Sequence, residues 1–386
     1  MSDPAPATDD RQVLVVGDGV TGLSAAAFLH REGLDPTVVA APTAPRRGFG
    51  TVDRSVTLWH TAVALLAELG VPAELSPSAV EIDEWLFTRA DGTVIDRLGT
   101  AHVGDSDHPF LAVDRRRLRR ALRDRLPANS VRVTKTPREL RVAGLPEVEF
   151  EDGVRERFDL VVGADGTDSW LRNAGFDAPE PIPWGTATWS FRADGADPSG
   201  TVGEAWDADG GAMVAVVPTA SGACGRLVTT ADDPDVAAEA LAGALDAPDH
   251  PVTCGLDLPG PDALVGTPAR VVRADPWATD RLALLGDAAR SLPPCSLAPS
   301  LAVEDAYVLA EELAVRGTSA AALGRYANRR RGRLGRLYDR AAPDGARRGP
   351  LSVAGLPDLL ECRLALLRSS FARRLPAGVV SSTDRL

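Results

Sequence analysis

A glycine-rich turn near the start of the chain restricts the available folds more than any other segment. Gly17, Gly19 and Gly22 follow the apolar run 12–16 and precede Val20–Arg31, where apolar residues recur at helical spacing. In such a turn the first glycine makes the tight bend, the second lets the backbone approach a pyrophosphate, and the third lets the helix pack on the strand. The N–H groups at the start of the helix then face the anion. The sequence therefore predicts a β-α-β unit with a dinucleotide phosphate at this turn.

The end of the next predicted strand leaves the nucleotide open. A dinucleotide site usually has Asp or Glu there to hold the ribose hydroxyls. In this chain the residue directly after the predicted strand 37–39 is Ala40. Arg46 and Arg47 follow. An NADP-type site, with an arginine on the 2′-phosphate, is therefore an alternative at this point.

Two further turns follow apolar strands later in the chain. The run 158–162 leads into Asp165-Gly166, and the run 282–285 leads into Gly286-Asp287. Each motif alone is modest, but the three in this order and spacing are specific. The chain resembles the group A flavoprotein monooxygenases, the para-hydroxybenzoate hydroxylase-like family, over nearly its whole length.

This resemblance implies FAD as the cofactor, with NADPH or NADH as electron donor. In that family the aspartate of the Gly-Asp motif binds the ribityl chain of FAD, which corresponds to Asp287. The Asp-Gly turn helps to hold FAD and the passing NADPH pyrophosphate, and the arginine matched by Arg115 contacts FAD. The expected cofactor-binding residues are Gly17, Gly19, Val20, Gly22, Arg46, Arg115, Asp165, Gly166, Gly286 and Asp287. The motifs at Glu304-Asp305-Ala306 also fit the family pattern.

The fold expected is α/β: a Rossmann-like FAD-binding domain interleaved with a mixed, mostly antiparallel β-sheet substrate domain, plus C-terminal helices. Alternating runs on either side of Asp91-Gly92 predict a hairpin, which marks one change from parallel to antiparallel strands. The predicted divisions are a disordered tail 1–10, an FAD-binding domain 11–80, 100–180 and 270–345, a substrate domain 81–99 and 181–269, and a C-terminal helical segment 346–386.

Local patterns predict several elements within these domains. A helix is expected over 56–69 and an arginine-rich helix over 114–126. Trp189 and Phe191 are interpreted as sheet core rather than as a pocket lining. Tyr326 and Arg329–Arg331 are interpreted as a solvated basic face.

Composition excludes some partners and compartments. The net charge of −12 disfavours nucleic acid, because phosphate binding needs clustered positive charge. The four cysteines are scattered without a C-x-x-C pair, so no metal is expected. The start of the chain lacks the pattern of a secretory signal, and no apolar run approaches the roughly 20 residues of a spanning helix. We expect a cytoplasmic protein, monomeric or homodimeric, without a transmembrane segment.

Some positions depart from the family pattern. Asp18 stands where relatives usually carry Ala or Gly, and its carboxylate would repel the pyrophosphate unless it is paired or turned away. Arg290 stands where many relatives have His. The segment 295–300 replaces a glycine-rich loop, and Pro299 within it removes an N–H donor. These departures fit a weakened or altered flavin site.

The resemblance implies an FAD-dependent monooxygenase that hydroxylates or epoxidises a small hydrophobic or aromatic substrate through a flavin C4a-hydroperoxide. The flavin carries this chemistry, so no catalytic side chain is assigned. Two alternatives stay open: a hydride-transferring FAD reductase of the same fold, and a flavin-free binding protein descended from the family.

Overall fold

The computed structural model describes residues 12–42, 55–102, 108–195, 200–207, 212–245, 249–252, 256–291 and 298–341. The predicted tail 1–10, the C-terminal segment 346–386 and Arg46 lie outside these residues.

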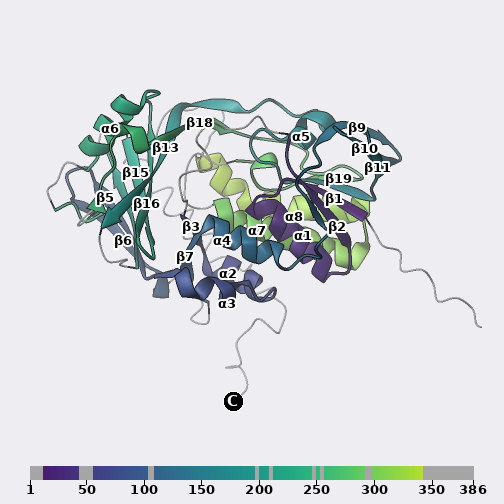
Figure 1. The fold of residues 1–386 in the computed structure, drawn as a ribbon, viewed down its shortest axis with the longest axis horizontal. Coiled ribbons are helices and arrows are strands. Elements are labelled where there is room, and N and C mark those ends of the chain that lie inside the picture. The colour runs from purple at the N-terminus through teal and green to yellow at the C-terminus, as the bar shows by residue number, and fades with distance from the viewer. Residues whose placement is uncertain are drawn as a thin grey trace, which may run out of the picture.

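A five-stranded parallel sheet forms one end of the molecule (Figure 1). Its strand order is β19-β12-β1-β2-β8, and every neighbouring pair is parallel. Valine and leucine dominate the central strands, which are buried on both faces, as is usual where helices cover a parallel sheet. The strands are β1 (Gln12–Val16), β2 (Asp35–Val39), β8 (Val131–Arg132), β12 (Leu160–Gly163) and β19 (Leu282–Leu284).

Helices from both ends of the described chain pack against this sheet. α1 (Val20–Arg31) lies between the sheet region and the long helix α7 (Ala298–Arg316), against which α8 (Ala320–Ala341) packs (Figure 1). α4 (Arg115–Arg123) packs on α1, and the short α5 (Trp170–Gly175) follows β12. α7 is buried over most of its length, because it is surrounded by α1, α2, α8 and β3.

A small sheet of order β3-β7-β4 connects the two ends of the molecule. β3 (Ser55–Leu58) pairs with β7 (Phe110–Asp114), and β4 (Val80–Ile82) pairs with the other edge of β7. The helix predicted over 56–69 is therefore wrong at its start, since a strand occupies 55–58 and the helix α2 begins at His60. The neighbouring helical elements are α2 (His60–Ala67), α3 (Val71–Leu75) and the 3₁₀ turns η1 (Ser76–Ser78) and η2 (Thr100–His102).

An eight-stranded sheet forms the opposite end (Figure 1). All its pairs are antiparallel except β5 with β14. The hairpin predicted around Asp91-Gly92 is confirmed as β5 and β6. The strands are β5 (Glu84–Arg89), β6 (Val94–Gly99), β13 (Ile182–Gly195), β14 (Thr201–Trp206), β15 (Ala212–Thr219), β16 (Gly222–Thr229), β17 (Leu256–Asp257) and β18 (Val265–Val271).

The two faces of this sheet have different neighbours. Trp189 and Phe191 on β13 pack with Ala237 and Leu241 of α6 (Pro234–Gly243), which confirms their interpretation as sheet core. Because side chains alternate along a strand, Arg192 points to the other face, toward the small sheet. The remaining elements are the hairpin sheet β9 (Pro137–Ala143), β10 (Leu145–Phe150) and β11 (Arg155–Arg157), and the 3₁₀ turns η3 (Pro261–Ala263) and η4 (Gly286–Ala288).

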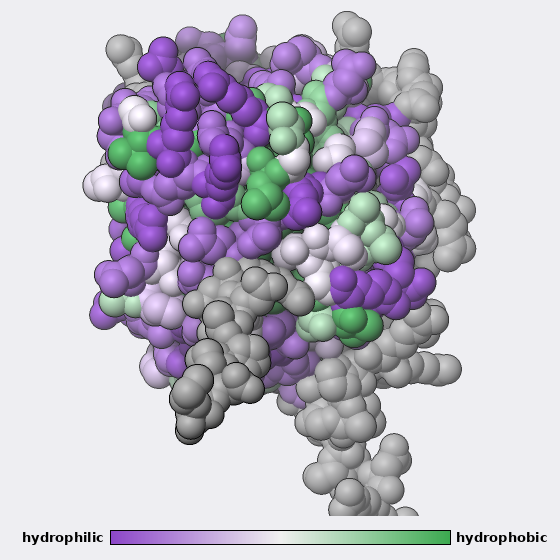
Figure 2. Space-filling model, turned by 90° about the vertical axis from the view of Figure 1, so that its right-hand side faces the viewer, coloured by the Kyte–Doolittle hydropathy of each residue, from purple (hydrophilic) through white to green (hydrophobic). Residues whose placement is uncertain are grey.

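The surface at the parallel-sheet end is mostly hydrophilic. In Figure 2 hydrophobic residues on this face form small separate islands among polar side chains. In the described part of the chain, none of the helices is both long enough and apolar enough to cross a bilayer.

A buried ion cluster joins α7 to α8. Arg330 contacts both Glu304 and Asp305, and Arg333 also contacts Glu304. Although burial opposes ionisation of Glu304, the charges of Arg333 and Arg330 lower its pKa. The interpretation of this segment as a solvated basic face is wrong for Arg330 and Tyr326, which are 1% and 0% exposed. The Tyr326 hydroxyl donates to the carbonyl of Leu284, so α8 also anchors the end of β19 (2.8 Å).

Replacing Arg330 with leucine is expected to lower the free energy of unfolding by about 3–5 kcal/mol, because it leaves Asp305 and Glu304 buried without this counter-charge. Chemical denaturation at neutral pH measures the loss. Arg329→Leu is the matched control on the same helix. Arg329 is 26% exposed, and its buried partner Glu312 keeps Arg316 and Arg325 as counter-charges, so its loss should stay below about 1 kcal/mol. Equal losses in the two variants would contradict the assignment.

Candidate functional site

The three predicted turns lie at one edge of the parallel sheet. Gly17 follows β1, Asp165-Gly166 follows β12, and Gly286-Asp287 follows β19. These strands are direct neighbours and run parallel, so their carboxyl ends meet. Ligands of open α/β sheets bind at this edge. Residues up to 270 positions apart are therefore brought to one place, as the family resemblance predicted.

Close packing of the first turn explains two of its glycines. Gly17 has φ +114°, and a Cβ there would lie 2.4 Å from the carbonyl oxygen of Ala164. A Cβ on Gly22 would lie 1.8 Å from the carbonyl oxygen of Gly17. Any side chain at either position would therefore push α1 away from β1 and β12.

Gly19 has the opposite surroundings. A Cβ at Gly19 would meet nothing within 4 Å, so the glycine leaves open space at the start of α1. Gly19 is also the N-cap of α1 and provides no side-chain hydrogen bond to the first turn. The first N–H groups of a helix have no partner inside the helix, and the positive end of its dipole lies there. The open space beside Gly19 and the first N–H groups of α1, which begins at Val20, can accommodate a pyrophosphate.

Asp18, the residue expected to repel a phosphate, is paired. Arg119 of α4 contacts its carboxylate at 2.6 Å and donates a second hydrogen bond to its backbone carbonyl at 3.0 Å. The side chains are 39% and 37% exposed, so water weakens the attraction but does not remove it. The pair neutralises the charge that Asp18 introduces into the turn.

Asp165 caps α5. Its Oδ2 accepts hydrogen bonds from the backbone N–H groups of Trp170 at 2.6 Å and Leu171 at 3.3 Å. Its Oδ1 is buried and has no hydrogen-bond partner among the described residues. Burial raises the pKa of this carboxyl above its usual range. An unpartnered oxygen at the sheet edge is consistent with a site that receives a ligand hydroxyl, while Gly166 beside it has φ +81° and open space around its Cα.

Arg172 ties two of the turns together. It is 1% exposed and donates to the carbonyl of Thr167 at 2.7 Å and to the carbonyl of Ala288 at 3.1 Å. The first carbonyl belongs to the turn after β12 and the second to the turn after β19. The sequence gives no sign of this role, because the carbonyl of Ala288 lies 116 positions away in the chain.

The Gly286-Asp287 turn is held by the buried ion cluster. Asp305 of α7 accepts a hydrogen bond from the N–H of Gly286 at 2.9 Å, and Arg330 neutralises the same carboxylate. Gly286 adopts φ +55°, a left-handed conformation that favours glycine. Asp287 follows in η4 with a half-buried side chain.

The altered loop before α7 is only partly within the described residues. Pro299 lies in the first turn of α7, where a missing N–H costs no helical hydrogen bond. Ser300 accepts a hydrogen bond from the N–H of Trp59 at 2.9 Å and donates to the carbonyl of Thr57 at 3.3 Å. The start of α7 is therefore fixed to the junction of β3 and α2.

The FAD contacts predicted for Arg115 and Arg46 are not tested by the structure. Arg115 is the first residue of α4 and is exposed, so its contact with FAD stays a prediction, as does that of Arg46. Arg119, one helical turn further along, is the residue that the sequence reasoning missed. Within a run of arginines, only the packing of α4 on α1 distinguishes it.

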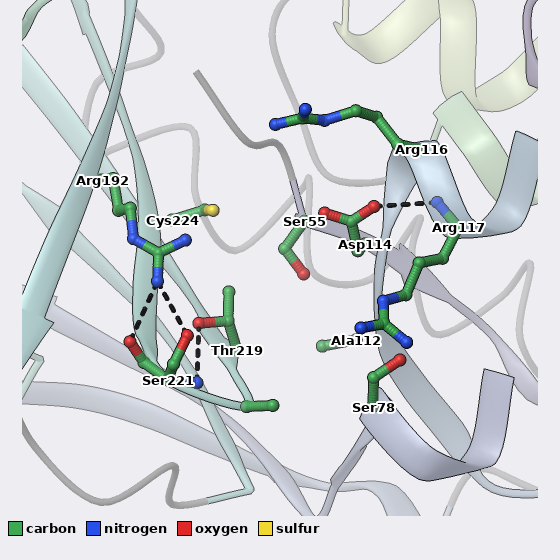
Figure 3. A pocket seen from close by; sticks show the side chains of 11 residues that line it. Ser55, Ser78, Ala112, Asp114, Arg116, Arg117, Arg192, Thr219, Ser221 and Cys224 are labelled. Carbon is green, nitrogen blue, oxygen red and sulfur yellow. Dashed lines mark hydrogen bonds between the residues drawn. The ribbon is translucent and has the colours of Figure 1, made fainter. Parts of the chain in front are cut away.

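A polar cavity of about 380 Å³ lies between the small sheet and the eight-stranded sheet (Figure 3). Ser55, Asp114 and Arg116 line it from β3, β7 and α4, while Arg192 and Cys224 line it from β13 and β16. Its volume lies within the range of about 300–1,000 Å³ typical of small-molecule sites. The sequence reasoning did not find it, since its two walls are far apart in the chain.

A family model described as an FAD binding domain matches residues 10–341. The chain belongs to this family. The expected cofactor FAD and the expected α/β fold class are therefore confirmed. The assignment of the three turns to FAD stays a prediction.

Curated relatives are named as monooxygenases. The chain is 32% identical over 171 residues to a 3-amino-4-hydroxybenzoate 2-monooxygenase of Streptomyces platensis, covering 42% of this chain and 41% of the relative. It is 27% identical over 342 residues to the aurachin C monooxygenase/isomerase of Stigmatella aurantiaca, covering 81% and 83%. The first of these alignments thus spans less than half of either protein.

Solved structures show the same fold. HpxO of Klebsiella pneumoniae, in complex with FAD and uric acid, has a TM-score of 0.71 at 22% identity, covering 96% of this chain and 95% of that chain. PqsL of P. aeruginosa, in complex with 2-aminobenzoylacetate, has a TM-score of 0.69 at 20% identity, covering 92% and 99%.

Replacing Arg119 with glutamine is expected to weaken FAD binding about threefold to tenfold, because Asp18 then faces the pyrophosphate without its counter-charge. Fluorescence titration of the apoprotein with FAD measures the dissociation constant. Arg120→Gln removes the same charge from a neighbouring exposed position and should change it little.

The double variant Asp18→Asn with Arg119→Gln tests the cause. Neutralising Asp18 should restore most of the lost affinity. If the double variant binds FAD as weakly as Arg119→Gln alone, repulsion by Asp18 is not the reason.

Proposed function

We propose that this protein is an FAD-dependent monooxygenase that uses NADPH or NADH and O₂ to hydroxylate or epoxidise a small aromatic substrate. The observation that carries the proposal is the meeting of the Gly17, Asp165 and Gly286 turns at the carboxyl edge of β1, β12 and β19. The named activities of the curated relatives support the oxygenase reaction over hydride transfer alone.

In this proposal one set of segments binds the cofactor and another set encloses the substrate. The ranges 11–80, 100–180 and 270–345 hold FAD, and the ranges 81–99 and 181–269 enclose the substrate. We expect a cytoplasmic protein that acts as a monomer or homodimer.

Residues at the sheet edge would hold FAD. The open backbone at Gly19 and Val20 binds its pyrophosphate, because helix N–H groups and the helix dipole both favour an anion there. Asp287 accepts hydrogen bonds from the ribityl hydroxyls, and Asp165-Gly166 lines the same groove. When bound, FAD supplies the redox chemistry: it accepts hydride from the nicotinamide and activates O₂.

The start of α7 adds an electrostatic contribution. The positive end of its dipole lies at Ala298–Ser300, and Ser300 holds this turn in place. A helix N-terminus stabilises negative charge near it, which favours a reduced anionic flavin. The flavin-free alternative rested on Asp18, Ala40 and Pro299, and the pairing of Asp18 with Arg119 weakens the first of these three arguments.

Asp287→Ala is expected to abolish retention of FAD, because the variant lacks the carboxylate that holds the ribityl hydroxyls. The absorbance of the purified protein near 450 nm, relative to protein concentration, measures flavin content, on the order of one FAD per chain for the parent. Asp280→Ala, an exposed acidic residue just before β19, is the control. An unchanged flavin content in Asp287→Ala would contradict the assigned role.

Oxygen stoichiometry tests the reaction class. In a coupled monooxygenase one NAD(P)H and one O₂ are consumed per product, one oxygen atom enters the product and the other leaves as water. An oxygen electrode and mass spectrometry after reaction under ¹⁸O₂ measure both. Substrate reduction without oxygen consumption would replace the proposal with the hydride-transferring reductase.

A further inference from the structure

The outward face of α4 carries a row of arginines. Arg116, Arg120 and Arg123 are exposed and stand at positions i, i+4 and i+7, so they lie on one face of the helix. We call these three residues the arginine stripe. On the opposite face Leu118 and Leu122 are buried in the core. The helix therefore presents positive charge to solvent and apolar side chains to the interior.

Neighbouring acidic side chains are paired with arginines outside the stripe. Arg119 contacts the carboxylate of Asp18, and Arg125, just after α4, contacts that of Glu74 on α3. These pairs neutralise acidic groups that α1 and α3 would otherwise place beside the stripe. The positive charge of the outward face is therefore preserved.

The acidic residue at the end of α4 reduces this charge only a little. Asp124 lies 3.8 Å from Arg120, and the two side chains are 56% and 84% exposed. An exposed pair at this spacing is weak, because water screens the attraction. Both side chains stay available to an outside partner.

Acidic residues gather on a distant part of the molecule. α6 has exposed Asp235 and Glu239, follows Asp232 and Asp233, and contains neither arginine nor lysine. It packs on the outer face of the eight-stranded sheet, whereas α4 follows the small sheet on the other side (Figure 1). Packed layers lie about 10 Å apart, and the Debye length at physiological ionic strength is about 8 Å. The acids of α6 therefore weaken the potential at the stripe only slightly.

The composition of this face indicates a partner that is recognised by charge alone. The exposed residues of α4 are all arginines. A protein partner usually binds through aromatic or apolar anchors at the centre of the interface, and this face offers none. A nucleic acid duplex held by charge usually receives about six to ten phosphate contacts, more than the stripe provides. An anionic lipid surface needs neither, because each nearby arginine adds about fivefold to the affinity.

We propose that the arginine stripe of α4 docks this protein on an anionic phospholipid surface. The contact is peripheral, since Leu118 and Leu122 are packed in the core and cannot enter the bilayer. Binding by charge alone is weak, reversible and sensitive to salt. The inference concerns a surface outside the proposed FAD site and does not depend on the oxygenase reaction.

Vesicle sedimentation tests the docking. The full-length protein is mixed with vesicles of phosphatidylcholine alone, or with vesicles in which about one third of the lipid is phosphatidylserine. It should sediment with the mixed vesicles only, and salt at about 1 M, where the Debye length is about 3 Å, should release it. Equal binding to both kinds of vesicle, or no binding to the mixed vesicles, overturns the proposal.

Paired double variants test the role of α4. Arg120→Gln with Arg123→Gln should lower the partition coefficient for the mixed vesicles about twentyfold. Arg97→Gln with Arg141→Gln removes the same charge from β6 and β9, where the side chains are 52% and 55% exposed, and should partition like the parent. Unchanged binding by the first variant, or an equal loss in the second, overturns the assignment to the stripe. Tm shows that each variant is folded; should the first not fold, Arg120→Gln alone, with an expected loss of about fivefold, decides.

A nucleic acid is the other polyanion that the stripe could meet. Fluorescence anisotropy with a labelled double-stranded DNA oligonucleotide, at the salt concentration of the vesicle assay, measures this binding. Affinity for DNA without affinity for the mixed vesicles would make α4 a nucleic-acid surface, and the lipid assignment would be wrong. Vesicle binding without DNA binding supports the lipid surface.

Discussion

The close approach of α1 to the turn after β1 is the contact on which the site depends. Gly22 lies so near the carbonyl of Gly17 that a Cβ would be placed 1.8 Å from that oxygen. This approach sets the start of α1 against the ends of β1 and β12, so that its N–H groups face the edge where the other turns meet. Elsewhere at this edge the structure adds hydrogen bonds to hold that geometry, such as those of Arg172 to the turns after β12 and β19.

Buried and half-buried charges stabilise the rest of the site. Asp305 accepts from the N–H of Gly286 and is itself neutralised by Arg330, so an ion cluster between α7 and α8 positions the last turn. Burial raises the pKa of Asp305 even beside that arginine, which indicates how strongly its charge depends on the pair. The pair of Asp18 and Arg119 performs a similar task at the first turn, in a more exposed setting.

Local sequence patterns predicted most elements but not their surroundings. The helix begun by Asp114 and the hairpin at Asp91-Gly92 were predicted correctly, because capping and turn residues act over a few positions. The strand at Ser55–Leu58 was mistaken for helix, since a short apolar run has no decisive period. Pairing with β7 is what makes it a strand. Arg330 was interpreted as solvated for a related reason: its partners lie on another helix.

The sequence by itself determined the three turns at Gly17, Asp165 and Gly286, their order and the class of fold. Glycine at 17, 22 and 286 is required by backbone conformation or close contact, and such requirements leave a readable residue type. Only the tertiary structure decided how charges are used. Arg119 meets Asp18 across 101 positions, and Arg192 of β13 lines the same cavity as Arg116 of α4. One arginine in a sequence looks like another, and its role depends on which partner the fold brings within reach.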